Sequence, residues 1–186
     1  ERIKKGESDV LWRGRPKYLA KTSGTTSGVK YIPLTKDSLP NHFGTARNAL
    51  FNYYARTGKG DWIDGKMIFL SGSPELEEIG GIPTGRLSGI VNHMVPAWLR
   101  TNQLPSYETN IIEDWETKVD RIVDETIDQD MTVIAGIPSW VQMYFERLKE
   151  RSGKPVGELF PNFQLFIYGG VNFEPYRNKF ENLMGR

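Results

Sequence analysis

Short apolar runs alternate with amphipathic helical patterns, and this alternation restricts the fold more than any other feature of the chain. The expected strands are bounded by turn residues and comprise Met67–Leu70, Met131–Gly136 and Phe163–Tyr168. Apolar residues recur every three or four positions over 115–126 and 138–148, which is the spacing of a helix with one buried face. A further helix is expected from about Glu174. Apolar strands separated by helices are typical of buried parallel sheets, so we predict an α/β fold with a parallel or mixed sheet covered by helices.

The first half of the chain is expected to be less regular. Lys17–Lys21 and Tyr31–Leu34 are predicted to be short strands on either side of a Ser/Thr/Gly run. A helix should follow, capped near Thr35 or Ser38, because apolar residues then recur at helical spacing: Leu39, Phe43, Ala46, Leu50 and Tyr53. The Gly- and Glu-rich segment 75–85 is predicted to be a loop. A helix over about 87–100 should be kinked or ended by Pro96.

The composition excludes several classes of function. The 24 basic and 23 acidic side chains give a formal charge of +1, whereas a nucleic-acid-binding surface needs a surplus of Lys and Arg. No apolar run approaches the roughly 20 residues of a membrane-spanning helix, and the opening residues predict no signal peptide. The absence of cysteine excludes disulfides and thiolate chemistry and favours a cytoplasmic location. We therefore expect neither nucleic acid nor a membrane as a partner, and the length favours one domain.

Thr22–Lys30 has the chemistry of an anion-binding loop. It reads Thr-Ser-Gly-Thr-Thr-Ser-Gly-Val-Lys. Glycines let backbone N–H groups converge on an anion, and hydroxyl and ammonium groups add donors and charge, so the loop suits a polyphosphate. It is not a Walker A loop, in which four residues separate the glycines and Lys follows directly, because three residues separate Gly24 from Gly28 and Val29 precedes Lys30. The residues alone also allow a solvated hairpin turn, since Ser, Thr and Gly are common in any loop.

The loop and two later corners resemble the motifs of one enzyme family. Thr22–Gly28, followed by Lys30–Pro33, resembles the phosphate-binding motif of the adenylate-forming superfamily, which includes acyl-CoA synthetases and luciferases. The tail Tyr31–Leu34 is similar to that of the auxin-responsive acyl acid–amido synthetases and their bacterial relatives. Gly136–Trp140 resembles the corner beside that family's acyl pocket, and Tyr168–Val171 resembles its adenine-lining Gly-Gly stretch. The family usually has two residues between the second glycine and the lysine, where this chain has one.

The resemblance implies roles for three groups of residues. The phosphates of ATP would be held by Ser23, Gly24, Thr25, Thr26, Ser27 and Lys30. The adenine would lie against Gly169, Gly170 and Val171. The acyl-acid pocket would be lined by Ile137, Ser139 and Trp140. From the residues alone, Gly169–Gly170 is better explained as an ordinary break after a strand. Trp140 is equally compatible with a core position on the same helical face as Tyr144.

The resemblance also implies the chemistry. In this family, a carboxylic acid attacks the α-phosphorus of ATP to give an acyl-adenylate and pyrophosphate, and an amine such as an amino acid then displaces AMP to form an amide. The implied cofactors are ATP and Mg²⁺, which neutralises the phosphates. Residues 1–186 would form part of a large N-terminal domain that binds nucleotide and acyl acid, without the family's mobile C-terminal domain. The fragment alone is then expected to be inactive.

Two other functions are compatible with the residues. A non-catalytic α/β module would use the Ser/Thr/Gly loop to bind a phosphate group or a partner peptide. A phosphotransferase would keep the nucleotide and release ADP rather than AMP.

The sequence assigns neither a catalytic residue nor a resident metal site. His42 and His93 are too isolated to form a metal site. Arg47 is better explained as a solvated residue than as a contact to a substrate carboxylate. Capping at the start of the helix over 115–126 is expected from Asn110, Glu113 and Asp114.

Overall fold

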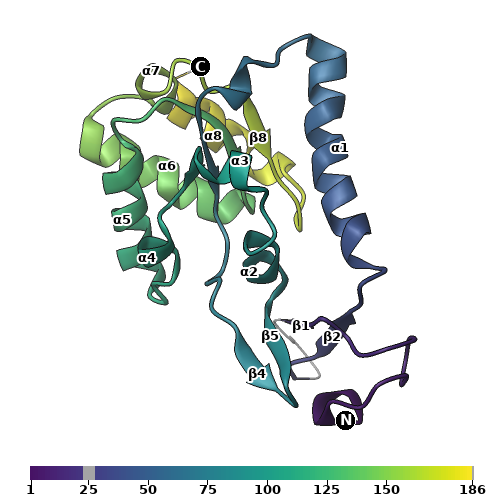
Figure 1. Cartoon of the computed structure of the whole chain (residues 1–186). Coiled ribbons are helices and arrows are strands. Elements are labelled where there is room, and N and C mark those ends of the chain that lie inside the picture. The colour runs from purple at the N-terminus through teal and green to yellow at the C-terminus, as the bar shows by residue number, and fades with distance from the viewer. Residues whose placement is uncertain (23–27, 186) are drawn as a thin grey trace. The chain divides into compact units, whose positions relative to one another are not determined.

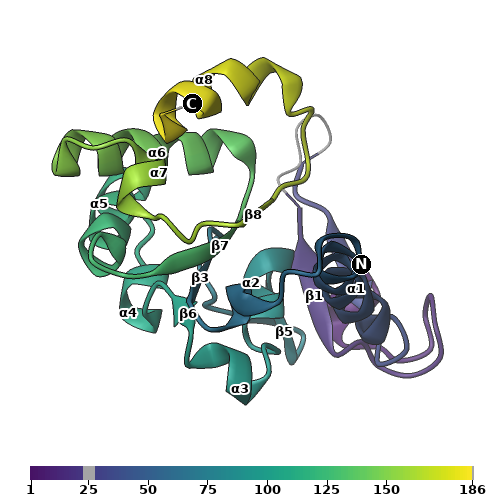
Figure 2. The same ribbon diagram turned by 90° about the horizontal axis from the view of Figure 1, so that it is seen from above.

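The computed structural model of the chain describes residues 1–22 and 28–185, and the chain divides into two compact units. Unit 1 comprises Glu1–Lys59 and Ser73–Val95, and unit 2 comprises Gly60–Gly72 and Pro96–Arg186. Each unit is built on a four-stranded sheet (Figure 1 and Figure 2). Because the chain passes from unit 1 to unit 2 and back before ending in unit 2, residues distant in sequence meet within each unit.

The sheet of unit 1 has the strand order β2-β1-β5-β4. Its strands are Tyr18–Lys21 (β1), Tyr31–Leu34 (β2), Glu77–Ile79 (β4) and Ile82–Arg86 (β5). β1 pairs antiparallel with β2 and parallel with β5, and β4 and β5 form a second antiparallel hairpin. The two strands predicted around the Ser/Thr/Gly segment are therefore confirmed, and they pair antiparallel with each other.

The prediction of a loop over residues 75–85 is wrong, because this segment supplies β4 and most of β5. Gly80 and Gly81 have φ values of +56° and +69°, and a type I′ hairpin turn requires positive φ at both central residues. A Cβ at Gly80 would collide with the carbonyl oxygen of Lys4, so the N-terminal 3-10 turn Ile3–Lys5 packs closely on this hairpin. The Gly and Glu content reflects a tight turn and an exposed edge strand rather than irregular backbone.

Two helices belong to unit 1, within the part of the chain that is described: Leu39–Thr57 (α1) and Leu87–Asn92 (α2). The predicted start of α1 is confirmed. The backbone N–H of Thr35 donates to Ser38 Oγ at 2.9 Å, and the N–H of Ser38 donates to Thr35 Oγ1 at 3.2 Å. The predicted helix over about 87–100 is broken into two helices, which agrees with the expectation that Pro96 would kink or end it. α2 ends at Asn92, and Pro96 is the N-cap of a separate helix, Ala97–Arg100.

The sheet of unit 2 is entirely parallel and has the order β6-β3-β7-β8. Its strands are Lys66–Phe69 (β3), Gln103–Leu104 (β6), Met131–Ala135 (β7) and Leu165–Ile167 (β8). Its helices are Ala97–Arg100 (α3), Tyr107–Asn110 (α4), Trp115–Thr126 (α5), Pro138–Ser152 (α6), Val156–Leu159 (α7) and Arg177–Met184 (α8), with 3-10 turns at Asp61–Ile63 and Glu174–Tyr176. The predicted α/β class is confirmed, since apolar parallel strands alternate with helices.

The core of unit 2 packs α5, α6 and α8 against β3 and β7. Figure 2 shows these helices along the same side of β7 and β8. Tyr144 is fully buried in this core, and its hydroxyl donates to Thr126 Oγ1 at 2.7 Å. The Thr126 hydroxyl in turn donates to the carbonyl of Ile122 at 2.7 Å. The phenol is thus satisfied in an apolar core, and burial raises the pKa of Tyr144.

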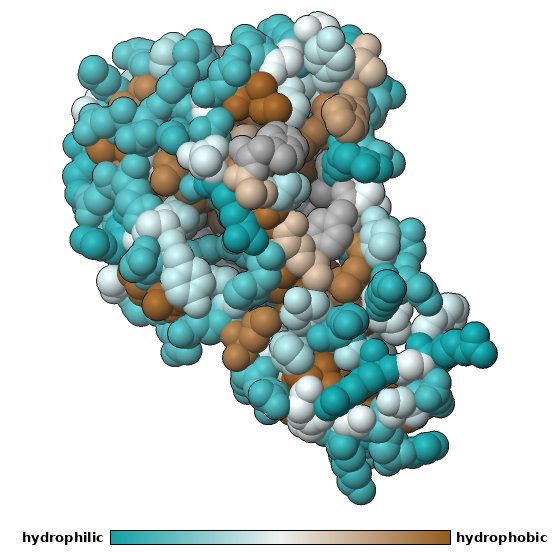
Figure 3. Space-filling model, viewed as in Figure 1, coloured by the Kyte–Doolittle hydropathy of each residue, from teal (hydrophilic) through white to brown (hydrophobic). Residues whose placement is uncertain are grey.

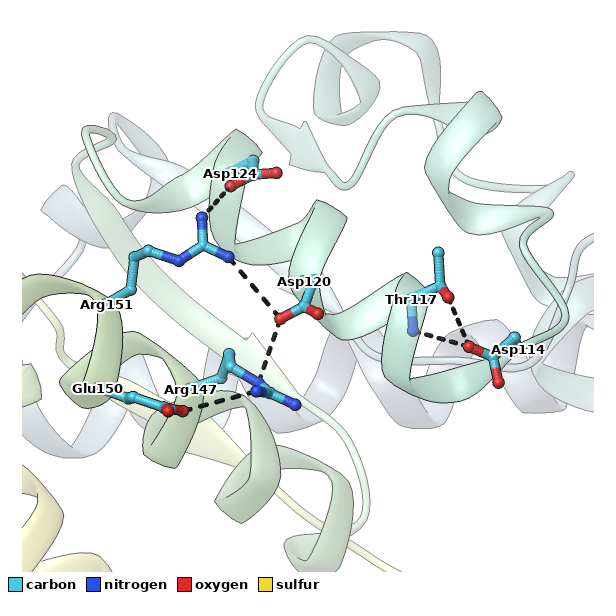
Figure 4. Close-up of polar contacts among 7 residues, drawn as sticks. All are labelled: Asp114, Thr117, Asp120, Asp124, Arg147, Glu150 and Arg151. Atoms are coloured by element: carbon cyan, nitrogen blue, oxygen red, sulfur yellow. Dashed lines mark hydrogen bonds and ion pairs between the residues drawn. The ribbon is translucent and has the colours of Figure 1, made fainter.

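The outer faces of α5 and α6 carry ion pairs. Asp120 Oδ1 lies 3.1 Å from Arg147 Nε, and Asp124 Oδ1 lies 2.6 Å from Arg151 Nη1. Figure 3 shows the flank over α5 as largely hydrophilic. Figure 4 shows these pairs and the start of α5, where the Asp114 carboxylate accepts a hydrogen bond from the backbone N–H of Thr117 at 2.9 Å. The predicted capping of this helix is confirmed for Asp114.

Candidate functional site

The Ser/Thr/Gly loop is described only at its two ends. The backbone N–H of Thr22 donates to the Lys30 carbonyl at 2.9 Å, and the N–H of Lys30 donates to Thr22 Oγ1 at 3.3 Å. These bonds continue the β1–β2 ladder beyond the Lys21–Tyr31 pair and fix where the segment leaves the sheet. The predicted phosphate contacts within the loop lie outside the described residues and stay predictions: Ser23, Gly24, Thr25, Thr26 and Ser27.

Cations gather on the strand ends beside this loop. Lys30 is exposed, as the predicted phosphate contact requires. Lys21 lies opposite Arg86 in the parallel β1–β5 register, at the ends where both strands leave the sheet. Lys21 Nζ lies 3.0 Å from Glu77 Oε1, and this hydrogen bond with the carboxylate raises the pKa of Lys21. The sequence analysis missed Lys21 and Arg86, because only the strand register brings them together.

The two predicted corners of the acyl and adenine sites meet in unit 2. β7 and β8 are adjacent and parallel, so their carboxyl ends lie at the same edge of the sheet. The N–H of Gly136, directly after β7, donates to the carbonyl of Ile167 at 3.0 Å. A Cβ on Gly170 would lie 3.6 Å from Ile137 Cγ2. Ligands of open α/β sheets bind at the carboxyl ends of the strands, so this edge is the candidate site.

The segment after β8 leaves an open surface at this edge. Gly170 has φ of +84°, and this backbone conformation alone accounts for a glycine at position 170. Gly169 has ordinary φ, and a Cβ there would meet nothing within 4 Å. Tyr168 and Val171 are 49% and 47% exposed, and the Tyr168 ring stacks on Phe173 with centroids 4.8 Å apart. The surface beside Gly169 is therefore open, and the contact of Gly169, Gly170 and Val171 with adenine stays a prediction.

The predicted acyl-pocket residues differ in their surroundings. Ile137 and Ser139 are partly buried at the beginning of α6. Trp140 packs on the core, and its ring lies 4.4 Å from the Trp115 ring, centroid to centroid. This packing fits the interpretation of Trp140 as a core residue. Its contact with an acyl acid stays a prediction, as do those of Ile137 and Ser139.

A buried lysine lies beside the same edge and was missed from the sequence. Lys118 on α5 is only 3% exposed. Its ammonium donates to the carbonyls of Ser71, after β3, and Asn110, at the end of α4, at 3.1 and 2.6 Å. The signal was present in the spacing, since Lys118 follows Trp115 by three positions and precedes Ile122 by four, on the apolar face of the helix.

The described residues supply donors for an anion but no metal cage. Within 1–22 and 28–185, no group of three or more His, Asp or Glu could hold a metal ion. His93 is instead tied to the backbone, with Nε2 2.6 Å from the Pro74 carbonyl oxygen. The cationic side chains of Lys30 and Arg86 can attract an anion such as a phosphate group but cannot ligate Mg²⁺. Among the described helices, none has the length and apolarity needed to cross a membrane.

Comparison with known proteins identifies relatives of the whole chain. The model of the GH3 family N-terminal domain matches residues 1–109 and 86–186. A comparison with curated proteins gave no match. Among solved structures, AtGH3.15 acyl acid amido synthetase in complex with 2,4-DB is similar with a TM-score of 0.67 at 14% sequence identity. The match covers 99% of this chain and 42% of that chain, so this chain spans less than half of that synthetase. The likeness supports the α/β fold described above.

Proposed function

The chain belongs to the GH3 family, and on that basis we propose that it is the nucleotide- and acid-binding part of an ATP-dependent acyl acid–amido synthetase. The observation that carries the proposal is the contact of the Ile137 and Gly170 corners at the carboxyl edge of the parallel sheet. One corner is the predicted acid side and the other the predicted adenine side. Adjacent sites for both substrates are what adenylation needs, because its catalysis depends chiefly on positioning and charge stabilisation.

The proposed reaction has two steps. A carboxylate oxygen of a small acid attacks the α-phosphorus of ATP, and the bond from that phosphorus to the bridging oxygen breaks to release pyrophosphate. The hydroxyls and N–H groups of residues 23–27, with Lys30, hold the departing phosphates. Mg²⁺ arriving with ATP would neutralise their charge. An amine, such as that of an amino acid, then attacks the acyl carbon, forms the amide and releases AMP.

In the proposed arrangement, one corner contacts the adenine of ATP and the other contacts the acid. Gly169, Gly170 and Val171 contact the adenine on the open surface beside Tyr168. Ile137 and Ser139 contact the acid at the start of α6, with Trp140 behind them in the core. Residues 1–186 would then be part of the large N-terminal domain of a cytoplasmic enzyme, whose partners are small acids and amines.

Replacing Thr25 and Thr26 by Ala in the full-length protein tests the role of the loop. Acid-dependent AMP formation should fall by about a hundredfold, as for loss of donors to a developing charge. The free energy of unfolding should change by less than about 0.5 kcal/mol, as for surface sites. Thr45→Ala, an exposed threonine on α1, is the matched control and should leave AMP formation unchanged. A parent protein that forms no AMP would favour the non-catalytic phosphate- or peptide-binding module, and formation of ADP would favour a phosphotransferase.

A further inference from the structure

We infer that Lys118 is a positioning residue for the candidate acid corner, the segment Gly136–Trp140 that follows β7. Its buried ammonium anchors the segment that follows β3, and this segment fixes the corner that follows β7. The role at the acid corner rests on the proposed function, whereas the anchor rests on the contacts of Lys118 alone.

The ammonium of Lys118 donates hydrogen bonds to backbone carbonyls in the protein interior. A lysine that is 3% exposed is rare, because desolvation of an ammonium is costly unless polar groups replace its water. Its donation to the Ser71 and Asn110 carbonyls supplies that replacement. These carbonyls belong to two different segments, so the ammonium holds the exit of β3 to the end of α4.

The anchored segment is the first link in a row of backbone hydrogen bonds across the sheet edge. Next to Ser71, the N–H of Leu70 donates to the carbonyl of Ala135 at 2.8 Å. The N–H of Gly136 then donates to the carbonyl of Ile167 at 3.0 Å. The row therefore runs from the residue beside the anchor, through the end of β7, to the end of β8.

Side chains pack closely around this row of backbone hydrogen bonds. A Cβ on Gly136 would lie 3.0 Å from Leu70 Cβ and 3.1 Å from Val141 Cγ2. Only a residue without a Cβ fits there, so Leu70 and Val141 lie close to the Gly136 backbone, and a shift of Leu70 is passed on through its hydrogen bond to Ala135, the residue before Gly136. Ile137, the residue next to Gly136, is the predicted wall of the acid pocket. Loss of the ammonium would release Ser71. The resulting displacement would therefore affect Ile137 in the acid corner before it affects the adenine corner, Gly169–Val171.

Hydrogen exchange of Lys118→Met tests the anchor independently of activity. Met retains an apolar side chain of similar length and removes the charged donors. We expect the Leu70 and Gly136 amides to lose protection by about tenfold, while amides of Phe145 and Leu148 within α6 change by less than about twofold. Lys149→Met, an exposed lysine on the same unit, is the control and should change none of them. Unchanged protection at Leu70 and Gly136, or an equal loss throughout α6, would overturn the anchor.

Chemical rescue separates the donors of the ammonium from its bulk. Lys118→Ala removes a group with the size and charge of n-propylammonium. Adding n-propylammonium should restore protection at Leu70 and Gly136, whereas tetramethylammonium, which has no N–H donor, should not. Equal restoration by both cations, or by neither, would contradict anchoring through hydrogen bonds to the carbonyls.

ATP–pyrophosphate exchange without an amine acceptor tests the positioning role in the full-length protein. Lys118→Met should raise the KM for the acid by about tenfold and change the KM for ATP by less than about twofold. An equal rise in both constants, or no change in either, would overturn positioning of the acid corner. A parent protein without exchange would overturn the proposed function and this role together, while hydrogen exchange would still decide whether Lys118 is an anchor.

Discussion

Gly170 lies against Ile137, since a Cβ on the glycine would be 3.6 Å from Ile137 Cγ2. The contact joins the turn after β8 to the start of α6, two segments that the chain order alone does not bring together. Parallel pairing of β7 with β8 makes it possible, because both strands end at the same edge of the sheet. Under the proposed function, this contact makes the acid-binding and adenine-binding residues neighbours.

Gly136→Ala is expected to destabilise the protein by about 1–3 kcal/mol, the usual cost of overpacking. The new methyl group would lie 3.0 Å from Leu70 Cβ and 3.1 Å from Val141 Cγ2. Urea unfolding measures the change. Gly169→Ala is the matched control at the same sheet edge, where a Cβ meets nothing within 4 Å, and it should shift stability by less than about 0.5 kcal/mol. Equal effects of the two changes would contradict the packing described around Gly136.

Tyr144→Phe is expected to lower the free energy of unfolding by about 1 kcal/mol, the net value of a typical hydrogen bond. The change removes the 2.7 Å bond from the Tyr144 hydroxyl to Thr126 Oγ1 and leaves the ring in place. Tyr107→Phe, on an exposed ring, is the control and should have no effect measurable by urea unfolding. Equal stability of both variants would show that the buried hydroxyl bond contributes nothing.

The Tyr144→Phe variant also tests how alkaline pH changes the free energy of unfolding. Burial raises the pKa of Tyr144 in the folded protein above the value of about 10 that a tyrosine has in the unfolded chain. The stabilising contribution of the neutral phenol is therefore present in full below pH ~10 and is lost as the pH rises towards the folded value. Above pH ~10, the stability difference between the parent and Tyr144→Phe should fall by up to about 1.4 kcal/mol per pH unit. A difference that is constant with pH would contradict burial of this phenol.

Asp114→Ala is expected to destabilise the start of α5, whereas Asp114→Asn should retain most of the cap. Hydrogen bonds from the Thr117 hydroxyl and the Thr117 backbone N–H hold the pKa of Asp114 below its ordinary value of 3.8. The contribution of the carboxylate is thus present above the ordinary pKa and is lost as the pH falls through the lower, folded pKa. Thermal unfolding at several pH values checks this, with Glu113→Ala as the neighbouring acidic control. Part of the difference between the parent and Asp114→Ala should remain in strong acid, because a neutral carboxyl oxygen still accepts a hydrogen bond. A difference of the same size in strong acid and at neutral pH would contradict a contribution of the charge to the cap.

The sequence predicted those parts of the fold that depend on local patterns. The apolar spacing of α5 and α6 appears directly in Val119, Ile122, Val141 and Leu148, which are all buried. The hairpin β4–β5 was missed because β4 is short and mostly exposed, β5 carries Pro83 and Gly85, and Gly80–Gly81 is compatible with either a loop or a tight turn.

The candidate site was predictable only in part, for a different reason. Its residue types were recognisable from the Ser/Thr/Gly loop and the two corners. The contact of Ile137 with Gly170 and the partners of Lys118 depend on segments that meet only after the sheet has formed. The spacing places Lys118 on the apolar face of α5, but the sequence does not show which carbonyls accept its hydrogen bonds.

Incorporation of labelled pyrophosphate into ATP, measured with the full-length protein and a panel of carboxylic acids, tests the central claim most directly. Exchange reports reversible formation of an acyl-adenylate, before any amine is needed. We predict exchange that depends on at least one acid and is lost in the Thr25→Ala, Thr26→Ala double variant. The absence of exchange with every acid, under conditions where the protein is folded and binds ATP, would contradict an acid-activating function for this chain.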